Sequence, residues 1–206
     1  MEDYIAAEYS DIFNQAKVNF QDRSELVQVV SGAIGRRMDQ VVIDSLVAAS
    51  GTNTVANSVG GSTTNLNVAK LRDAKKQMDA KNVPAEGRCI IAHANNMDSL
   101  LAETSVTSSD FNTVKALVQG EVNSFLGFKF ISLGDRDEGG LAIDGSSDRI
   151  VYAFHKDSVG LGIGMNQQSR VDYIPEKTSF LVASMFSSGA VAIDADGITK
   201  ITCRES

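Results

Sequence analysis

Cysteine and histidine are scarce in this sequence of 206 residues, which contains two of each. The cysteines, Cys89 and Cys203, lie far apart, and each belongs to a run of residues typical of a β-strand. We therefore expect two buried free thiols and no disulfide bond. The histidines, His93 and His155, each end a predicted strand. They are too few and too scattered to form a zinc site with three protein ligands.

Long apolar runs and an excess of basic residues are also missing. No apolar stretch approaches the roughly 20 residues that span a bilayer, and the acidic N-terminus MEDYIAAEY lacks the apolar core of a signal peptide. We therefore expect a protein that stays in the cytoplasm and has no membrane partner. The 19 lysines and arginines are outnumbered by 26 acidic residues, which gives a net charge of −7. This balance argues against a nucleic-acid-binding surface, because basic clusters supply most of the affinity of such surfaces.

The glycine-rich segments do not match the ligand-binding motifs that they resemble in part. Gly160-Leu-Gly-Ile-Gly164 lacks the helix that follows a dinucleotide-binding loop, so it predicts a strand that contains glycines. The segment that begins with Asp135-Arg-Asp137 lacks an acidic ligand of a calcium loop and has Ser146, not Glu, at the twelfth position. Asp194-Ala-Asp196-Gly197 fits the turn of a β-hairpin. These segments predict neither a metal nor a cofactor.

Catalytic motifs are equally absent. The sequence contains no Gly-x-Ser-x-Gly, His-Glu-x-x-His or phosphate-loop Gly-Lys-Ser/Thr motif. Cys89 and His93 are the only candidates for a nucleophile and its base. Residues four apart on a strand are about 13 Å apart, which is too far for a hydrogen bond. We assign no catalytic, cofactor-binding or metal-binding residue, and an enzyme that uses Cys89 remains an alternative hypothesis.

A long helix, predicted from Asp22 to Ser50, is the strongest positive feature. Asp22 and Glu25 form a capping-box pattern at its start, and Gly51 is placed for a left-handed C-terminal cap. At 1.5 Å per residue the helix is roughly 40 Å long, about the diameter of a compact chain of this size. Such a helix is suited to support an extended plate. Its apolar positions fall on one broad face: Leu26, Val27, Val30, Ala33, Ile34, Met38, Val41 and Ala48.

Three residues in this helix carry further expectations. Gly32 and Gly35 each cost about 1 kcal/mol in a helix, and their spacing suggests that another backbone comes close. Arg37 lies near the apolar face and requires a partner, for which a neighbouring chain is one source.

The remaining patterns predict an α+β fold, with helices first, a mixed middle and strands at the end. No internal repeat is present. The expected elements are an amphipathic helix over Met1–Phe13, a loop or weak hairpin over 51–64, a helix over 68–81 capped by Asn67 or Asn65, a strand over 88–93, a helix over 95–103, a loop over 105–110, a helix over 111–117, a tight turn at Leu126-Gly127, a strand over 128–133, a charged loop over 134–148, a strand over 149–155, and a strand-rich segment over 160–203 that contains a hairpin turning at Asp196-Gly197.

Six segments, taken in order, carry a resemblance to a known family. They are Gly35-Arg-Arg-Met-Asp39, Asn67-Val-Ala-Lys-Leu, Val83-Pro84 followed by Arg88-Cys-Ile-Ile-Ala, GEVNSFLGFKFISL over 120–133, Ala153-Phe-His-Lys-Asp-Ser-Val-Gly160, and the terminal GAVAIDADGITKITC. Together these segments resemble a tailed-bacteriophage major capsid protein over nearly the whole chain, although no single segment is diagnostic.

The resemblance implies the Johnson fold of phage shell proteins, with a peripheral and an axial domain. Residues 1–65 would be peripheral, with the helix over 22–50 as the spine. Residues 66–170 would be axial, with the charged loop over 134–148 directed toward the capsomer axis. Residues 171–206 would return to the peripheral domain.

The function implied is structural. Subunits would form the pentamers and hexamers of an icosahedral shell that encloses DNA without reading its sequence, in contact with scaffolding, portal or decoration proteins. The protein would be made in the host cytoplasm and located in the virion capsid. Family members carry an N-terminal arm and an extended loop ahead of the spine, and only 21 residues precede it here. We expect both elements to be absent. The alternatives are an encapsulin-like nanocompartment shell and a DNA-binding virion protein.

Overall fold

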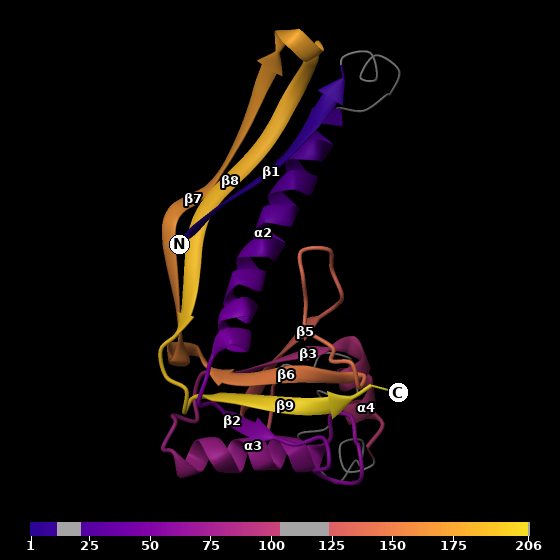
Figure 1. Ribbon diagram of the computed structural model, residues 1–206, viewed down its shortest axis with the longest axis vertical. Coiled ribbons are helices and arrows are strands. Elements are labelled where there is room, and N and C mark those ends of the chain that lie inside the picture. Colours follow the sequence, from indigo (N-terminus) through magenta and orange to yellow (C-terminus); the bar gives the residue numbers. More distant parts are fainter. Residues whose placement is uncertain (12–21, 104–123, 206) are drawn as a thin grey trace. The chain divides into compact units, whose positions relative to one another are not determined.

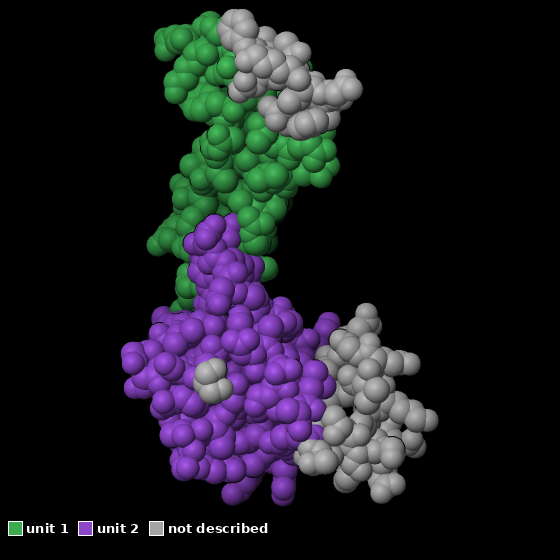
Figure 2. Space-filling view, turned by 90° about the vertical axis from the view of Figure 1, so that its right-hand side faces the viewer, with its two compact units in different colours: residues 1–44, 161–191 green, residues 45–160, 192–206 purple. Residues whose placement is uncertain are grey.

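The computed structural model describes residues 1–11, 22–103 and 124–205. The chain divides into two compact units, shown in different colours in Figure 2. Unit 1 comprises residues 1–44 and 161–191, and unit 2 comprises residues 45–160 and 192–206. The predicted domain assignment of 1–65, 66–170 and 171–206 stays a prediction, as does the absence of an N-terminal arm and an extended loop.

Helices and strands are mixed along the chain, which confirms the predicted α+β class. The elements are β1 (Glu2–Asp11), α2 (Asp22–Ala48), β2 (Asn53–Val55), α3 (Val68–Ala80), β3 (Arg88–His93), α4 (Ala94–Leu101), β4 (Ser124–Phe125), β5 (Phe128–Leu133), β6 (Asp148–His155), β7 (Val159–Ile174), β8 (Ser179–Ala192) and β9 (Ile198–Arg204), with the short 3₁₀ turns η1 (Lys156–Ser158) and η2 (Pro175–Lys177). The predicted loop over 105–110 and helix over 111–117 lie outside the described residues.

Unit 1 is a three-stranded sheet in the order β1-β8-β7, with the helix α2 along one face (Figure 1). The helix contacts the sheet through polar as well as apolar groups. The Gln167 side-chain amide donates to Ser31 Oγ at 2.7 Å, and the Arg23 guanidinium lies over the Phe180 ring at 4.3 Å. Strand alternation therefore places the odd-numbered residues of β7 and the even-numbered residues of β8 on the face that α2 covers.

The helix predicted for Met1–Phe13 is wrong, because this segment forms β1. It pairs antiparallel with β8 from Glu2 opposite Ser188 to Asp11 opposite Ser179. The apolar residues of so short a segment fit helical spacing and strand alternation alike. Pairing with the long strand β8 decides between them, since β8 supplies backbone partners along the whole segment. Phe13 lies outside the described residues.

Helix α2 begins at Asp22 and ends at Ala48, so the predicted range 22–50 is confirmed to within two residues. Its 27 residues span about 40 Å. The side chain of Asp22, and with it the capping box, lies outside what the structure describes.

The C-terminal end of α2 is capped from a distant strand. The Lys200 ammonium, on β9, donates to the carbonyl oxygens of Val47 at 2.9 Å and Ala49 at 2.8 Å. These carbonyls have no partner within the helix, and a cation at this end also interacts favourably with the helix dipole. Gly51 has a φ of +72°, the left-handed conformation predicted for it.

The close backbone expected at Gly32 and Gly35 is not found among the described residues, whereas the partner expected for Arg37 is found within the chain. A Cβ added at Gly32 would contact only the Arg36 side chain at 3.4 Å, and one at Gly35 would have nothing within 4 Å. No described backbone therefore requires either glycine. Arg37 finds its partners inside unit 1, with Asp44 Oδ2 at 3.7 Å and the Tyr4 ring at 4.8 Å.

Unit 2 is built on a six-stranded sheet in the order β2-β9-β6-β3-β5-β4. The pairs β2–β9 and β3–β5 are parallel, and the other pairs are antiparallel. Helix α3 packs on β2 and β9, and α4 packs on β3 and β5. The largest side chains of the apolar core are fully buried: Leu66, Leu71, Met78, Ile90, Leu100 and Phe128.

Several local predictions for unit 2 are confirmed. Asn67 caps α3, and its Oδ1 accepts from the Lys70 backbone N–H at 2.8 Å. Leu126 and Gly127 have φ values of +53° and +87°, so they form the tight turn between β4 and β5. The loop predicted over 51–64 contains the short strand β2, which pairs with β9.

The hairpin predicted to turn at Asp196-Gly197 is wrong. The strand before the turn, β8, belongs to the sheet of unit 1, whereas β9 lies between β2 and β6 in unit 2. The turn itself exists, since the Ile198 N–H donates to the Ala195 carbonyl at 3.2 Å. Gly197 is required there because a Cβ would lie 1.8 Å from Ser158 Oγ. Strand β9 instead pairs over seven residues with β6, from Phe154–Ile198 to Asp148–Arg204.

We expect Gly35→Ala to raise the free energy of unfolding by about 0.5–1 kcal/mol, because alanine favours the helix and the added methyl group meets open space. Gly127→Ala should have the opposite effect, since its φ of +87° strains any side chain. Urea denaturation followed by circular dichroism measures both. A lower midpoint for Gly35→Ala would contradict the open environment described for this residue.

Candidate functional site

The charged loop over 134–148 is held at its base by one buried side chain, that of Arg149 in β6. The residue is 1% exposed. Its Nη1 donates to Asp135 Oδ1 at 2.9 Å and to the Leu141 carbonyl at 3.1 Å, both in the loop. Its Nε donates to Glu205 Oε1 at 2.6 Å. One guanidinium therefore joins the loop, the sheet and the C-terminal segment.

A second arginine–carboxylate pair lies beside the first. Arg204 Nε donates to Asp148 Oδ1 at 2.6 Å, and the other oxygen of this carboxylate accepts from Asn57 Nδ2 at 2.9 Å. Asp148 and Arg204 are register partners on the antiparallel strands β6 and β9. The two pairs together attach residues 204 and 205 to the start of β6.

His93 lies between the two carboxylates that Arg149 contacts. Its Nε2 is 3.6 Å from Asp135 Oδ2, and its Nδ1 is 3.7 Å from Glu205 Oε1. The ring also caps α4, because Nδ1 accepts from the Asn95 backbone N–H at 3.3 Å. His93 thus has a structural role at the junction of β3 and α4.

Burial and pairing shift the pKa values of several groups in unit 2, among them Asp135, Lys70 and Cys203. The hydrogen bond from Arg149 lowers the pKa of the Asp135 carboxyl. Burial lowers the pKa of the Lys70 amine, whose Nζ donates to the carbonyl oxygens of Thr64 and Thr202 at 2.5 and 2.8 Å. Burial raises the pKa of the Cys203 thiol to about 12. Cys203 is therefore a protonated core residue and a poor nucleophile.

The candidate nucleophile and base are not brought together. The Cys89 thiol lies 3.9 Å from the Gly87 carbonyl, whereas the neighbours of the His93 ring are Asp135 and Glu205. Both cysteines are free thiols, as the sequence predicts, but only Cys203 is buried; Cys89 is partly exposed, so its predicted burial is wrong.

The aspartates of the two acidic segments stabilise turns or form an ion pair. Asp144 Oδ1 accepts from the Ser146 backbone N–H at 2.9 Å, and Asp194 Oδ1 accepts from the Asp196 backbone N–H at 3.0 Å. Asp196 also pairs with Lys81. Among the described residues, no group of three or more histidine, cysteine or acidic side chains is placed to hold a metal ion.

The segment Gly160–Gly164 lies in β7 and is a strand, as the sequence predicts. Two of its glycines allow Met1 to pack on the sheet. A Cβ at Gly162 would lie 3.1 Å from Met1 Cε, and one at Gly164 would lie 3.1 Å from Met1 Sδ.

The face of the unit 1 sheet that α2 does not cover carries exposed apolar residues on β1 and β8, whereas the β7 part of this face is polar. Tyr4 stacks on Phe186, with ring centroids 5.1 Å apart, on the helix side. Their sequence neighbours Ile5 and Met185 are register partners, so they point to the opposite face. Ile5 is 69% exposed there, and Tyr9, on the same face, is 45% exposed.

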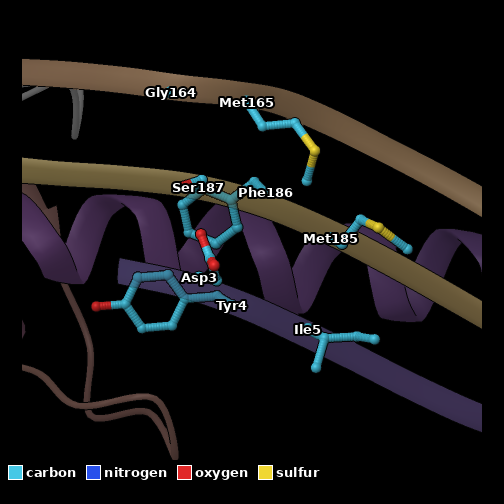
Figure 3. Close-up of a pocket in the computed structure, with 8 residues that line it drawn as sticks. All are labelled: Asp3, Tyr4, Ile5, Gly164, Met165, Met185, Phe186 and Ser187. Carbon is cyan, nitrogen blue, oxygen red and sulfur yellow. The ribbon is translucent and has the colours of Figure 1, made fainter. Parts of the chain in front are cut away.

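A shallow groove of about 500 Å³ crosses this sheet (Figure 3). It is formed by Asp3, Tyr4, Ile5, Gly164, Met165, Met185, Phe186 and Ser187, which come from all three strands. The groove has no cluster of titratable groups, since Asp3 is its only charged residue. Its lining is suited to a side chain of a packing partner and offers no catalytic group.

The sequence reasoning missed Arg149, Arg204 and Glu205. The visible signal was an Asp148-Arg149 pair at the start of one strand and an Arg204-Glu205 pair at the end of another. These pairs meet only because β6 and β9 are antiparallel neighbours, which requires knowledge of the sheet order.

We expect Arg149→Met to lower the free energy of unfolding by about 3 kcal/mol, because it leaves Glu205 largely buried and without its cation. The matched control is Arg170→Met, which removes an exposed arginine from β7. Chemical denaturation measures both changes. Equal effects of the two substitutions would contradict the anchoring role of Arg149.

We expect Cys203 to resist alkylation in the folded protein at about pH 8, where a thiol with a pKa of about 12 is almost entirely protonated. Mass spectrometry after iodoacetamide treatment should show no label on Cys203 until denaturant is added. A Cys89→Ser variant isolates its signal. Rapid labelling of the folded variant would contradict the buried environment.

Residues 1–205 match a family described as "Phage capsid protein". The search of curated proteins returns no match. None of the described helices is long and apolar enough to span a membrane.

Solved structures of phage particles share the fold at low sequence identity. A structure of Mycobacterium phage Che8 matches with a TM-score of 0.76 and 14% identity, over 97% of this chain and 70% of that one. The capsid of cyanophage P-SCSP1u matches with a TM-score of 0.73 and 18% identity, over 99% and 72%. The head of Helicobacter pylori bacteriophage KHP40 matches with a TM-score of 0.74 and 11% identity, over 98% and 75%.

These matches do not favour the nanocompartment alternative. A family match over almost the entire chain, together with the fold of phage shells, assigns a structural role in the virion capsid and no enzymatic one. The chain belongs to the phage capsid protein family and is a structural subunit that assembles into the capsid shell.

Proposed function

We propose that this subunit forms pentamers and hexamers that close an icosahedral shell around the phage genome. The observation that carries the proposal is the set of exposed apolar residues on β1 and β8, on the uncovered face of the unit 1 sheet, among them Ile5 and Tyr9. Singly exposed apolar residues are ordinary, but a contiguous apolar face on a sheet is typical of a packing surface. A neighbouring subunit is the natural partner for such a surface in a shell.

The two compact units correspond to the two domains that the resemblance implies. Unit 1, with the long helix α2 and its long-stranded sheet, takes the peripheral position. Unit 2, with the six-stranded sheet, takes the axial position. This division differs from the predicted one in three segments, since residues 45–65 and 192–206 belong to unit 2 and residues 161–170 belong to unit 1.

The loop over 134–148 is directed toward the axis of each capsomer in this arrangement. Arg149 supports the assignment, because it fixes both Asp135 near the start of the loop and Leu141 at its middle. An anchored loop loses less conformational entropy when copies meet around a symmetry axis.

The shell encloses DNA without reading its sequence, and scaffolding, portal and decoration proteins are its further partners. A net charge of −7 keeps the subunit soluble and does not prevent enclosure. The alternatives with an enzymatic or sequence-specific role have no residues to support them among those described.

We expect Ile5→Glu to abolish or strongly reduce shell formation while the fold is retained, because it places a charge on the proposed packing surface. Val29→Glu is the matched control, since Val29 is 63% exposed on α2. Negative-stain microscopy and analytical ultracentrifugation measure assembly, and circular dichroism checks the fold.

Rings of five and six subunits, or closed shells, from the unchanged chain would support the proposed organisation. A chain that remains monomeric under all conditions would contradict it. Normal assembly of Ile5→Glu, with the fold intact, would contradict the role of the sheet face while leaving the capsomer organisation open to other contacts.

A further inference from the structure

Helix α3 presents a basic surface to solvent. One side of the helix is buried against β2 and β9 through residues that include Leu71, Ala74 and Met78. The opposite side carries Arg72, Lys75 and Lys76. Arg72 and Lys76 are exposed, and Lys75 is partly exposed. Residues three and four apart are neighbours on a helix, so these cations form one cluster, which we call the α3 basic face.

No carboxylate of the described residues forms an ion pair with this cluster, although Asp79 lies three residues from Lys76 on the same helix. The side chains of Arg72, Lys75 and Lys76 make no hydrogen bond or ion pair with any residue that the structure describes. The two acidic residues of the helix are engaged elsewhere. Asp73 accepts from Gln77 Nε2 at 2.9 Å, and Asp79 pairs with the buried Arg88 at 2.7 Å.

The other cations of unit 2 are mostly committed to internal partners. Arg149 and Arg204 pair with carboxylates, while Lys70 and Lys200 donate to backbone carbonyls. Of the remaining described cations in this unit, Lys129 and Lys156 also lack such a partner, but they lie singly on other elements. Within unit 2, three of these five unpaired cations therefore lie together on α3, in a chain whose net charge is −7.

This arrangement is complementary to a polyanion. Duplex DNA carries one negative charge per roughly 1.7 Å of its axis, and proteins bind it without sequence preference through lysine and arginine contacts to phosphates. We propose that the α3 basic face contacts the phosphate backbone of the DNA enclosed in the shell. The inference rests on the proposed enclosure of the genome and adds the surface that touches it.

The α3 basic face of one subunit binds DNA weakly, but the many copies in a shell bind it strongly together. Three phosphate contacts alone give little affinity at physiological salt. The proposal requires α3 to face the interior of the shell, where many copies present the same surface and the second and later contacts on one DNA molecule are effectively intramolecular. A subunit that is acidic overall can then still hold DNA through this one surface.

The test compares two variants of equal charge. The first carries Arg72→Gln, Lys75→Gln and Lys76→Gln, which removes the α3 basic face. The second carries Lys129→Gln, Lys156→Gln and Arg170→Gln, which removes three exposed cations elsewhere. Each lowers the net charge from −7 to −10, since three positive charges are lost.

Binding of a fluorescent duplex to assembled capsomers is measured by anisotropy between about 50 and 200 mM salt. The unchanged protein should show a linear fall of log K with log salt. The α3 variant should show a slope smaller in magnitude by about 2–3 per bound subunit, because each phosphate contact contributes about 0.9. The control variant should keep a steeper slope than the α3 variant. The double variant Lys75→Gln/Lys76→Gln should give an intermediate slope. It replaces the triple variant in the comparison if the triple variant does not fold.

Absence of DNA binding by unchanged capsomers would overturn the inference, as would equal losses in the two triple variants. Polyglutamate and unlabelled DNA, added at equal charge, can each compete with the fluorescent duplex. If polyglutamate competes as effectively as DNA, the inference is overturned in favour of an acidic protein partner. Microscopy of the same samples separates the two proposals. Both triple variants should form normal shells, whereas failure of the unchanged chain to assemble counts against the proposed function.

Discussion

A guanidinium removed from water must be paired, and the partners of Arg149 fix two segments of unit 2 that its apolar core does not hold. Its partners come from the loop over 134–148 and from the C-terminal segment at Glu205. Neither segment has much apolar side chain to bury, so neither would be fixed by packing alone. The ion pairs fix them to the end of β6 because an unpaired buried charge costs several kcal/mol. His93 lies between the same carboxylates and extends the arrangement to the start of α4.

Local signals predicted the elements whose structure depends on nearby residues. Asn67 predicted the start of α3, and Leu126-Gly127 predicted the turn before β5. The helical spacing of apolar residues over a long segment predicted the bounds of α2 to within two residues. Each of these features is decided by hydrogen bonds or backbone angles over a few residues, so a single sequence is sufficient to identify them.

The failures share one physical cause, which is pairing between distant segments. β1 was taken for a helix because its partner β8 begins more than 160 residues later. The Asp196-Gly197 sequence favours a tight turn, and the turn forms. The strand that follows it, β9, pairs with β6 and not with the strand before the turn. The ion-pair site at Arg149 was missed for the same reason. The absence of catalytic motifs was visible from composition, but the apolar face of the unit 1 sheet depended on the register of β1.

The strand order of the two sheets determines where new backbone hydrogen bonds can form. In unit 2 the outermost strand β2 has three residues, so it offers few free N–H and C=O groups. In unit 1 the outermost strands β1 and β7 have ten and sixteen residues. Long open edges are templates for the addition of a strand from another molecule. Among the described strands, β1 and β7 of the unit 1 sheet are therefore long enough to accept a strand from another molecule.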